Sequence, residues 1–279
     1  MQKKQFCILT NCQGAAILKA LYTCKEFNNT YETYGYPNYI TNEITETIQK
    51  GIMNADVILY QPLSKDSKGV YCTDDLLKYK KESAIAIGFP YIYCNWLWNF
   101  YMELSRTYSY FFDNGIIREL KKTYTSEEIL SKFKNNEIDF KLEERKHRSL
   151  AILREKEKYT DIKVADYIDN NYKTKQLFNI PNHPTHHIFI HCANQVLQLL
   201  SIDYIIPENT NIGEYNDYKY FPIDQRVKET LQLTYCDQNK DYYLNLLTDV
   251  LNDFREIYPG NHHLKLCYFD HLNKDIYKV

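Results

Sequence analysis

Two short polar segments, far apart in the sequence, contain the residue types that acyl transfer requires. Residues 10–14 (Thr-Asn-Cys-Gln-Gly) hold a thiol and two carboxamides, and residues 181–187 (Pro-Asn-His-Pro-Thr-His-His) hold three imidazoles. Acyl transfer uses a nucleophile, a base and hydrogen-bond donors that hold the tetrahedral oxyanion. If folding brings the segments together, Cys12 can attack or contact a thioester, His183 can act as the base, and Gln13 can hold the oxyanion.

The local pattern around Cys12 favours a position at the edge of a sheet. An apolar run at 6–9 precedes the turn and a helix-like segment at 15–24 follows it. A strand that leads into a helix in this way ends at the sheet edge where open α/β folds bind ligands. Free N–H groups at a helix N-terminus favour negative charge, so we expect the thiolate of Cys12 to be favoured. The alternative is a buried, inert thiol.

Further polar side chains follow other predicted strands at the same edge. Gln61 ends the apolar run 55–60, and Phe89-Pro90 ends the run 84–88. Strand ends of a doubly wound sheet converge in space, so we expect these groups to surround one ligand site. The candidate substrate- or cofactor-binding residues from these turns are Asn11, Gly14, Gln61 and Asn182.

The histidine-rich segment allows a metal site as one interpretation. His183 and His187, like His187 and His191, are four residues apart, which is one face of a helix. However, Pro184 marks a helix start that leaves His183 outside, and neither a zinc-hydrolase glutamate nor a CxxC pair is present. We therefore predict no metal. We expect His183 in the site, His186 or His187 near it as a binding residue, and His191 packed on its helix.

Basic residues in the charged middle of the chain are candidate contacts for a cofactor. Arg154, beside Glu155, can reach the site from a helical segment, and the alternative is an exposed ion pair. The run at 145–148 (Arg-Lys-His-Arg) can meet cofactor phosphates, and the alternative is a charged surface. Arg154 is retained as a candidate cofactor-binding residue.

The elements that must position these residues alternate along the first third of the chain. This order predicts an α/β fold with a mostly parallel sheet and helices on both faces, in three layers of the flavodoxin type. The predicted strands cover residues 6–9, 30–36, 55–60, 84–88 and 177–180, and the predicted helices cover 15–24, 42–51, 73–82, 188–200, 225–231 and 242–258. Residues 95–172 are charged and helical in character, which predicts a helical insertion or cap within a single domain spanning 1–279.

Composition limits the functional class. The 279 residues are 44% hydrophobic, enough for a sizeable core, and a formal net charge of −2 provides no general attraction to nucleic acid or acidic membranes. No apolar stretch has the length of a membrane helix. The eight cysteines form no CxxC pair and no secretory signal is evident. We therefore expect reduced thiols in a cytoplasmic protein.

Taken in order, the motifs resemble those of the WcbI-like polysaccharide biosynthesis proteins. They are the Asn11-Cys12-Gln13-Gly14 turn, Gln61-Pro62, Phe89-Pro90, the helix from Asp161 to Asn171, and Leu177-Phe178 leading to Asn182-His183-Pro184. The similarity spans about residues 5 to 200. It implies an α/β fold related to SGNH hydrolases, an association with coenzyme A, and acetylation of capsular sugars. Cys12 falls where the related hydrolases have their serine, and Thr10 stands where the family has glycine.

The resemblance predicts an acetyl-coenzyme A-dependent O-acetyltransferase that modifies a sugar of a bacterial surface polysaccharide or its precursor. One alternative is an SGNH-like carbohydrate esterase, with water as the acceptor. Another is a non-catalytic glycan-binding protein that stacks Trp96, Trp98 and Tyr101 on sugar rings. The expected partners are a small acyl donor and a glycan acceptor.

Overall fold

The computed structural model describes residues 2–38, 44–63, 72–99, 115–213, 222–236 and 242–252. Its main sheet has four parallel strands in the order β2-β1-β3-β4, as the alternating sequence pattern predicted. The strands are β1 (Lys4–Thr10), β2 (Tyr31–Pro37), β3 (Val57–Tyr60) and β4 (Ile85–Gly88). The parallel α/β architecture is therefore confirmed.

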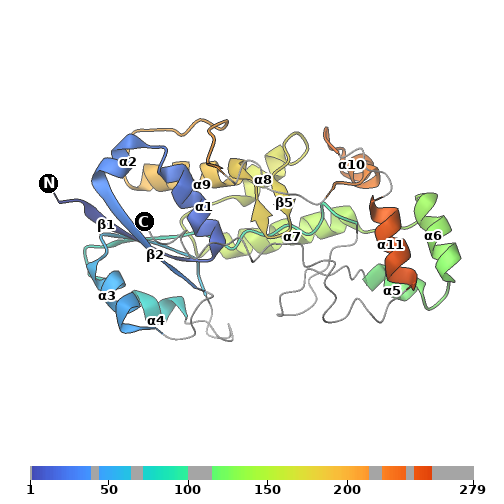
Figure 1. The fold of residues 1–279 in the computed structure, drawn as a ribbon, viewed down its shortest axis with the longest axis horizontal. Coiled ribbons are helices and arrows are strands. Elements are labelled where there is room, and N and C mark those ends of the chain that lie inside the picture. Colours follow the sequence, from blue (N-terminus) through green and yellow to red (C-terminus); the bar gives the residue numbers. More distant parts are fainter. Residues whose placement is uncertain are drawn as a thin grey trace.

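Helices cover both faces of this sheet because its strands are apolar on both sides. Phe6 and Ile8 of β1 pack in the cluster that contains α1 (Cys12–Leu21) and α9 (His186–Leu199). Cys7 and Leu9, which point the other way, pack against α3 (Glu46–Asn54) and α4 (Thr73–Leu77). The short α2 (Lys25–Thr30) lies on the α1 side (Figure 1). This arrangement gives the three predicted layers.

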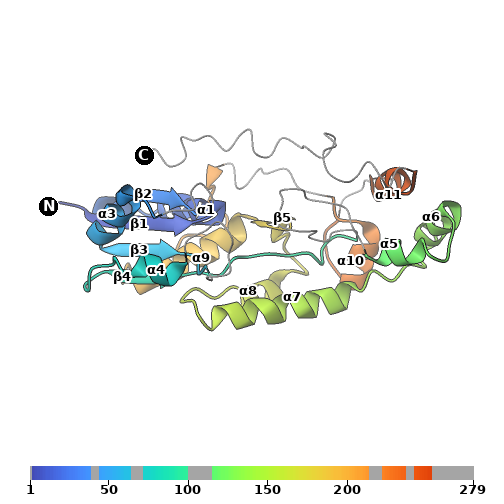
Figure 2. The ribbon, with the colours of Figure 1, turned by 90° about the horizontal axis from the view of Figure 1, so that it is seen from below.

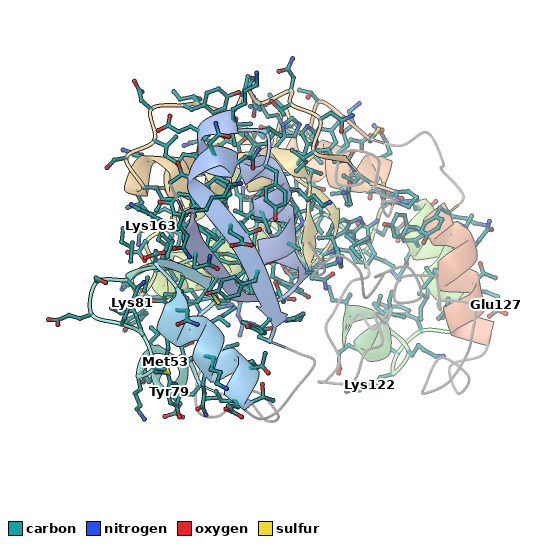
Figure 3. All side chains as sticks on the ribbon, turned by 60° about the vertical axis from the view of Figure 1, so that its left-hand side comes forward. Met53, Tyr79, Lys81, Lys122, Glu127 and Lys163 are labelled. Carbon is teal, nitrogen blue, oxygen red and sulfur yellow. The ribbon has the colours of Figure 1, made fainter. Side chains whose placement is uncertain are left out.

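The outer surface of the α3 and α4 layer faces solvent. Met53, near the end of α3, is 55% exposed, and Tyr79, just after α4, is 37% exposed. Figure 3 shows both side chains near Lys81, whose ammonium lies 2.8 Å from the carboxylate of Asp56. These residues close the amino-terminal side of the sheet, away from the strand ends that lead into the candidate site.

Helices also fill the described part of the predicted insertion. They are α5 (Gly115–Leu120), α6 (Ser126–Lys134), α7 (Leu142–Glu157) and α8 (Ala165–Asn171). The C-terminal helices α10 (Gln225–Leu231) and α11 (Tyr242–Asn252) pack on α7 and α6, at the end of the molecule far from the sheet (Figures 1 and 2). The predicted extension to residue 258 lies outside the described residues. One apolar cluster joins Phe6, Trp96, Phe133 and Val227, so sheet and inserted helices share a continuous core.

The segment that contains His183 differs from the prediction. Strand β5 (Phe178–Ile180) pairs antiparallel with β6 (His183–Pro184) in a separate two-stranded sheet. The position beside the end of β4 is already filled, because Gly88 N donates to Asp161 Oδ2 (2.7 Å) and Ile162 N donates to Gly88 O (3.0 Å). His183 therefore comes from a hairpin and not from a strand end of the main sheet.

Helix boundaries also shift at functionally important places. The first helix begins at Cys12 and not at residue 15, because Asn11 caps it by accepting a hydrogen bond from Gln13 N. Helix α9 begins at His186, two residues before the predicted start.

Within the described parts of the chain, no helix combines the length and apolar character needed to cross a membrane.

Candidate active site

The ends of β1 and β3 are joined by the side chain of Gln61. Its Oε1 accepts from Asn11 N at 3.0 Å, and its own main-chain N donates to Leu9 O at 3.2 Å. Asn11 Oδ1 accepts from Gln13 N at 2.9 Å and so fixes the first turn of α1. The carboxyl edge thus brings together Asn11, Cys12, Gln13 and Gln61, as the sequence pattern indicated.

Gln13 is buried, with 1% of its surface exposed, and its carboxamide is fully occupied. Its Nε2 donates to Ile92 O at 2.7 Å and to Asn182 O at 2.9 Å. Its Oε1 accepts from Ile92 N at 3.1 Å and from Gln61 Nε2 at 3.2 Å. A carboxamide has two N–H donors, and both have partners here. The predicted role of Gln13 as an oxyanion donor is therefore wrong for this geometry: the residue clamps three segments together.

The same clamp brings the two chemical segments together. The Asn182 carbonyl that Gln13 binds belongs to the residue directly before His183, and Gln13 directly follows Cys12. A second tie supports this arrangement, because Cys94 N donates to Pro181 O at 2.7 Å. Helices α1 and α9, which follow the two segments, also pack on each other. The cysteine and histidine segments thus meet at the start of α1.

The ring of His183 is set up to accept a proton. Its Nδ1 lies 2.8 Å from Asn182 Oδ1. A carboxamide oxygen only accepts hydrogen bonds, so the proton belongs on Nδ1 and the lone pair on Nε2. Burial lowers the pKa of His183 to about 4, because desolvation disfavours the imidazolium. The ring is therefore neutral near pH 7, as a general base must be.

Cys12 has the opposite ionisation from the one predicted. Cys12 is half-buried, and desolvation of its thiolate raises the pKa of the thiol to about 11, although the main-chain N–H groups of Cys12 and Gln13 act to lower it. Desolvation of the thiolate outweighs the helix N-terminus here. The expectation of a favoured thiolate is wrong for this state of the protein, and Cys12 is a neutral thiol near pH 7.

Gly14 allows the first turn of α1 to pack directly on β1. A Cβ at this position would lie 1.9 Å from Thr10 Oγ1 and 2.6 Å from Thr10 Cβ. Thr10 itself is buried, so it has no room to move away. The glycine that follows Cys12 and Gln13 is therefore required by packing.

Gly14→Ala should lower the free energy of unfolding by about 1–3 kcal/mol, the usual cost of overpacking. Thr10→Gly removes all three Thr10 atoms that the new methyl would meet. In that background the same substitution should cost less than about 1 kcal/mol. Urea unfolding of the four proteins in this cycle measures the coupling. An equal cost in both backgrounds would contradict the proposed contact.

The other histidines occupy the start of α9. The rings of His186 and His187 lie 4.0 Å apart, and His187 Nδ1 lies 3.6 Å from Glu208 Oε1. His191 stacks on Tyr167 at 4.2 Å, in agreement with its expected packing role. Among the described residues, no three His, Cys, Asp or Glu side chains are grouped closely enough to hold a metal ion.

The basic residues of α7 divide between surface and interior. Arg154 binds Asp166 and Asp169 of α8 at 2.9 and 2.8 Å, so it forms exposed ion pairs, although with these residues and not with Glu155, which pairs with Lys158. In the run at 145–148, the charged-surface alternative fits His147 and Arg148, which are exposed, but not the first two residues. Arg145 is partly buried and Lys146 is buried, where it donates to Tyr172 Oη at 2.9 Å.

The aromatic residues considered for glycan stacking do not form such a surface. Trp96 and Trp98 are 1% and 2% exposed and belong to the core. Tyr101 lies outside the described residues. The glycan-binding alternative therefore loses two of its three predicted contacts.

The half-buried, neutral ring of His183 should make the protein sensitive to mild acid. The unfolded histidine binds a proton near pH 6.5, whereas the folded one does so only near pH 4. Stability is therefore fully present above pH 6.5 and is lost as the pH falls toward 4. Between pH 7 and pH 5, His183→Leu should lose about 2 kcal/mol less stability than the wild type. Urea unfolding at both pH values tests this, and equal losses would contradict the burial of a neutral ring.

Comparison with known proteins relates this fold to polysaccharide biosynthesis. Residues 5–204 match the profile of the family described as polysaccharide biosynthesis enzyme WcbI. A solved structure of WcbI, described as a novel polysaccharide biosynthesis enzyme, matches with a TM-score of 0.75 and 20% sequence identity over 91% of each chain. That structure is the native protein without a disulfide bond between coenzyme A and one of its cysteines. Among curated proteins, no sequence matches this chain.

Proposed function

This chain belongs to the family of the polysaccharide biosynthesis enzyme WcbI, and we propose that it transfers an acetyl group from acetyl-coenzyme A to a sugar hydroxyl. The acceptor is a surface polysaccharide or its precursor. The proposed donor implies a cytoplasmic reaction. The observation that carries the proposal is the neutral ring of His183, whose segment is joined to the first turn of α1 through the hydrogen bond from Gln13 Nε2 to Asn182 O.

In the proposed reaction, His183 acts as the general base. Its Nε2 takes the proton of the acceptor hydroxyl as that oxygen attacks the thioester carbonyl. The negative charge that develops on the carbonyl oxygen faces the N-terminal end of α1, where the positive end of the helix dipole stabilises an anion. The C–S bond then breaks, and the imidazolium returns its proton to the departing coenzyme A thiolate. The products are an acetylated sugar and free coenzyme A.

Cys12 is proposed to line the thioester site and not to form an acetyl-enzyme. Its raised pKa keeps the thiol protonated, and a thiol is a weak nucleophile compared with its thiolate. The solved WcbI structure is the form without a disulfide bond between coenzyme A and one of its cysteines, and in this chain Cys12 lies at the carboxyl edge of the sheet, at the start of α1. The likeness supports a position for Cys12 near the sulfur end of the donor.

Binding of coenzyme A tests the proposal directly. At a concentration of 100 times Kd, coenzyme A should stabilise the protein by about 2.7 kcal/mol and raise the melting temperature by mass action. Arg154→Ala should keep the full shift, because its guanidinium is bound to Asp166 and Asp169. Thermal unfolding with coenzyme A and acetyl-coenzyme A measures both. No shift, together with release of acetate from acetylated sugars in the absence of coenzyme A, would favour the esterase instead.

A further inference from the structure

Residues 92–99, here called the strap, connect the cysteine and histidine segments from a third direction. Ile92 gives both its main-chain N–H and its carbonyl to Gln13, at 3.1 and 2.7 Å. Two residues later, Cys94 N donates to Pro181 O at 2.7 Å. The strap therefore contacts the residue after Cys12 and the residue two before His183. Any shift of the strap changes the relative position of the two segments.

Arg145, on α7 of the inserted helices, binds the far end of this strap. Its Nη1 donates to Trp98 O at 3.1 Å and to Asn99 O at 3.4 Å, and its Nη2 donates to Asn95 O. One guanidinium group thus donates hydrogen bonds to three main-chain carbonyls of a segment that has no regular helix or strand. A planar fork of N–H donors suits this arrangement, whereas a lysine ammonium has a single nitrogen with which to reach carbonyls in three places.

Neighbouring contacts reinforce the same connection. Lys146, the next residue of α7, lies 2.6 Å from Glu143 Oε2 and donates to Tyr172 Oη at 2.9 Å. The Tyr172 ring packs edge-on against Trp96 of the strap, with the ring centroids 5.1 Å apart. Two residues of α7 therefore hold the strap. Arg145 binds its main chain, and Lys146 contacts Tyr172, whose ring packs on the Trp96 side chain.

We propose that Arg145 is a positioning residue, which holds the strap so that Gln13 and the Asn182-His183 segment keep the geometry needed for acetyl transfer. The catalytic consequence rests on the function proposed above. Arg145 acts through the strap and takes no proton from the substrate. In this way the inserted helices contribute, through Arg145, to the alignment of the site at the edge of the sheet.

Arg145→Ala tests the inference on the full-length protein. Loss of the Arg145 guanidinium group should lower kcat for acetyl transfer by about 10–100-fold, because displacing reacting groups by around 1 Å has effects of that size. The KM for acetyl-coenzyme A should change less than about twofold, since Arg145 touches no proposed donor contact. Added guanidinium, at non-denaturing concentration, should restore part of kcat in Arg145→Ala. It should not do so in Arg145→Lys, whose ammonium occupies the space.

A second readout does not depend on acetyl transfer. The thiol of Cys12 should react slowly with iodoacetamide in the wild type, because burial raises its pKa to about 11. Loosening the strap admits water beside Gln13, so alkylation of Cys12 in Arg145→Ala should be about tenfold faster as that pKa falls toward its ordinary value. Peptide mass spectrometry separates Cys12 from the other cysteines. Arg148→Ala, an exposed arginine of the same helix, is the matched control and should match the wild type in both assays.

The outcomes separate the two proposals. Faster alkylation in Arg145→Ala, with no acetyl transfer by the wild type, would reject the proposed reaction and keep the positioning role. A folded Arg145→Ala with wild-type kcat and wild-type alkylation would overturn the positioning role. If Arg145→Ala does not fold, Arg145→Lys provides the same two measurements, and wild-type values there would overturn it as well.

Discussion

His183→Ala should lower kcat for acetyl transfer to a sugar acceptor by about 10²-fold or more, the usual contribution of a general base. The neutral ring has its proton on Nδ1, held 2.8 Å from Asn182 Oδ1, and this leaves Nε2 as the proton acceptor. Binding of coenzyme A should persist, because the clamp uses the carbonyl of Asn182 and not the imidazole. Release of free coenzyme A, followed with a thiol reagent, measures the rate.

Two variants sharpen the test of His183. Asn182→Leu removes the acceptor of Nδ1 but keeps the carbonyl that Gln13 binds, so it should reduce kcat less than His183→Ala does. Cys12→Ser should stay within about tenfold of the wild type if transfer is direct. A wild-type rate for His183→Ala would exclude it as the base. A loss in Cys12→Ser as large as that in His183→Ala would instead indicate an acetyl-enzyme.

The sheet and its functional edge could be predicted because their signals are local. Strand-forming runs alternate with helical segments, and each run ends in a polar or turn-forming residue. Since parallel strands share one carboxyl edge, Asn11 and Gln61 could be expected to meet, and the main-chain N of Asn11 donates to Gln61 Oε1 at 3.0 Å. The relation to SGNH hydrolases, by contrast, stays a prediction, as does the single-domain organisation.

The ionisation of the site could not be predicted, because it depends on burial that only folding creates. A cysteine at a helix N-terminus suggests a thiolate, but desolvation reverses this for Cys12. The contribution of Ile92 was missed for another reason. It supplies main-chain groups to Gln13, and every residue type has these groups, so no sequence signal marks it. The hairpin at 178–184 was missed because a three-residue strand pairs with whichever backbone segment has unbonded N–H and C=O groups beside it in the folded protein. The sequence does not show that this segment is β6 and not β4.

Gln13→Leu should have the largest effect on stability, lowering the free energy of unfolding by about 4 kcal/mol. The leucine leaves Ile92 N and Gln61 Nε2 without the acceptor that Gln13 provides, and it removes the donor from the carbonyls of Ile92 and Asn182. Buried groups that lose such partners cost about 1–3 kcal/mol each. Urea unfolding monitored by circular dichroism measures the loss.

Gln13→Glu distinguishes the loss of hydrogen bonds from a change in volume, because it keeps the shape of the side chain. Its carboxylate would face the carbonyl oxygens of Ile92 and Asn182, which accept hydrogen bonds from Gln13 Nε2 in the wild type. Repulsion should raise the pKa of the new carboxyl group, so the variant should lose stability relative to the wild type as the pH rises through that pKa. Gln198→Leu, at an exposed position of α9, is the matched control and should stay within about 0.5 kcal/mol of the wild type. Equal stabilities for Gln13→Glu and Gln198→Leu at pH 7 would mean that Gln13 does not join the two halves of the site.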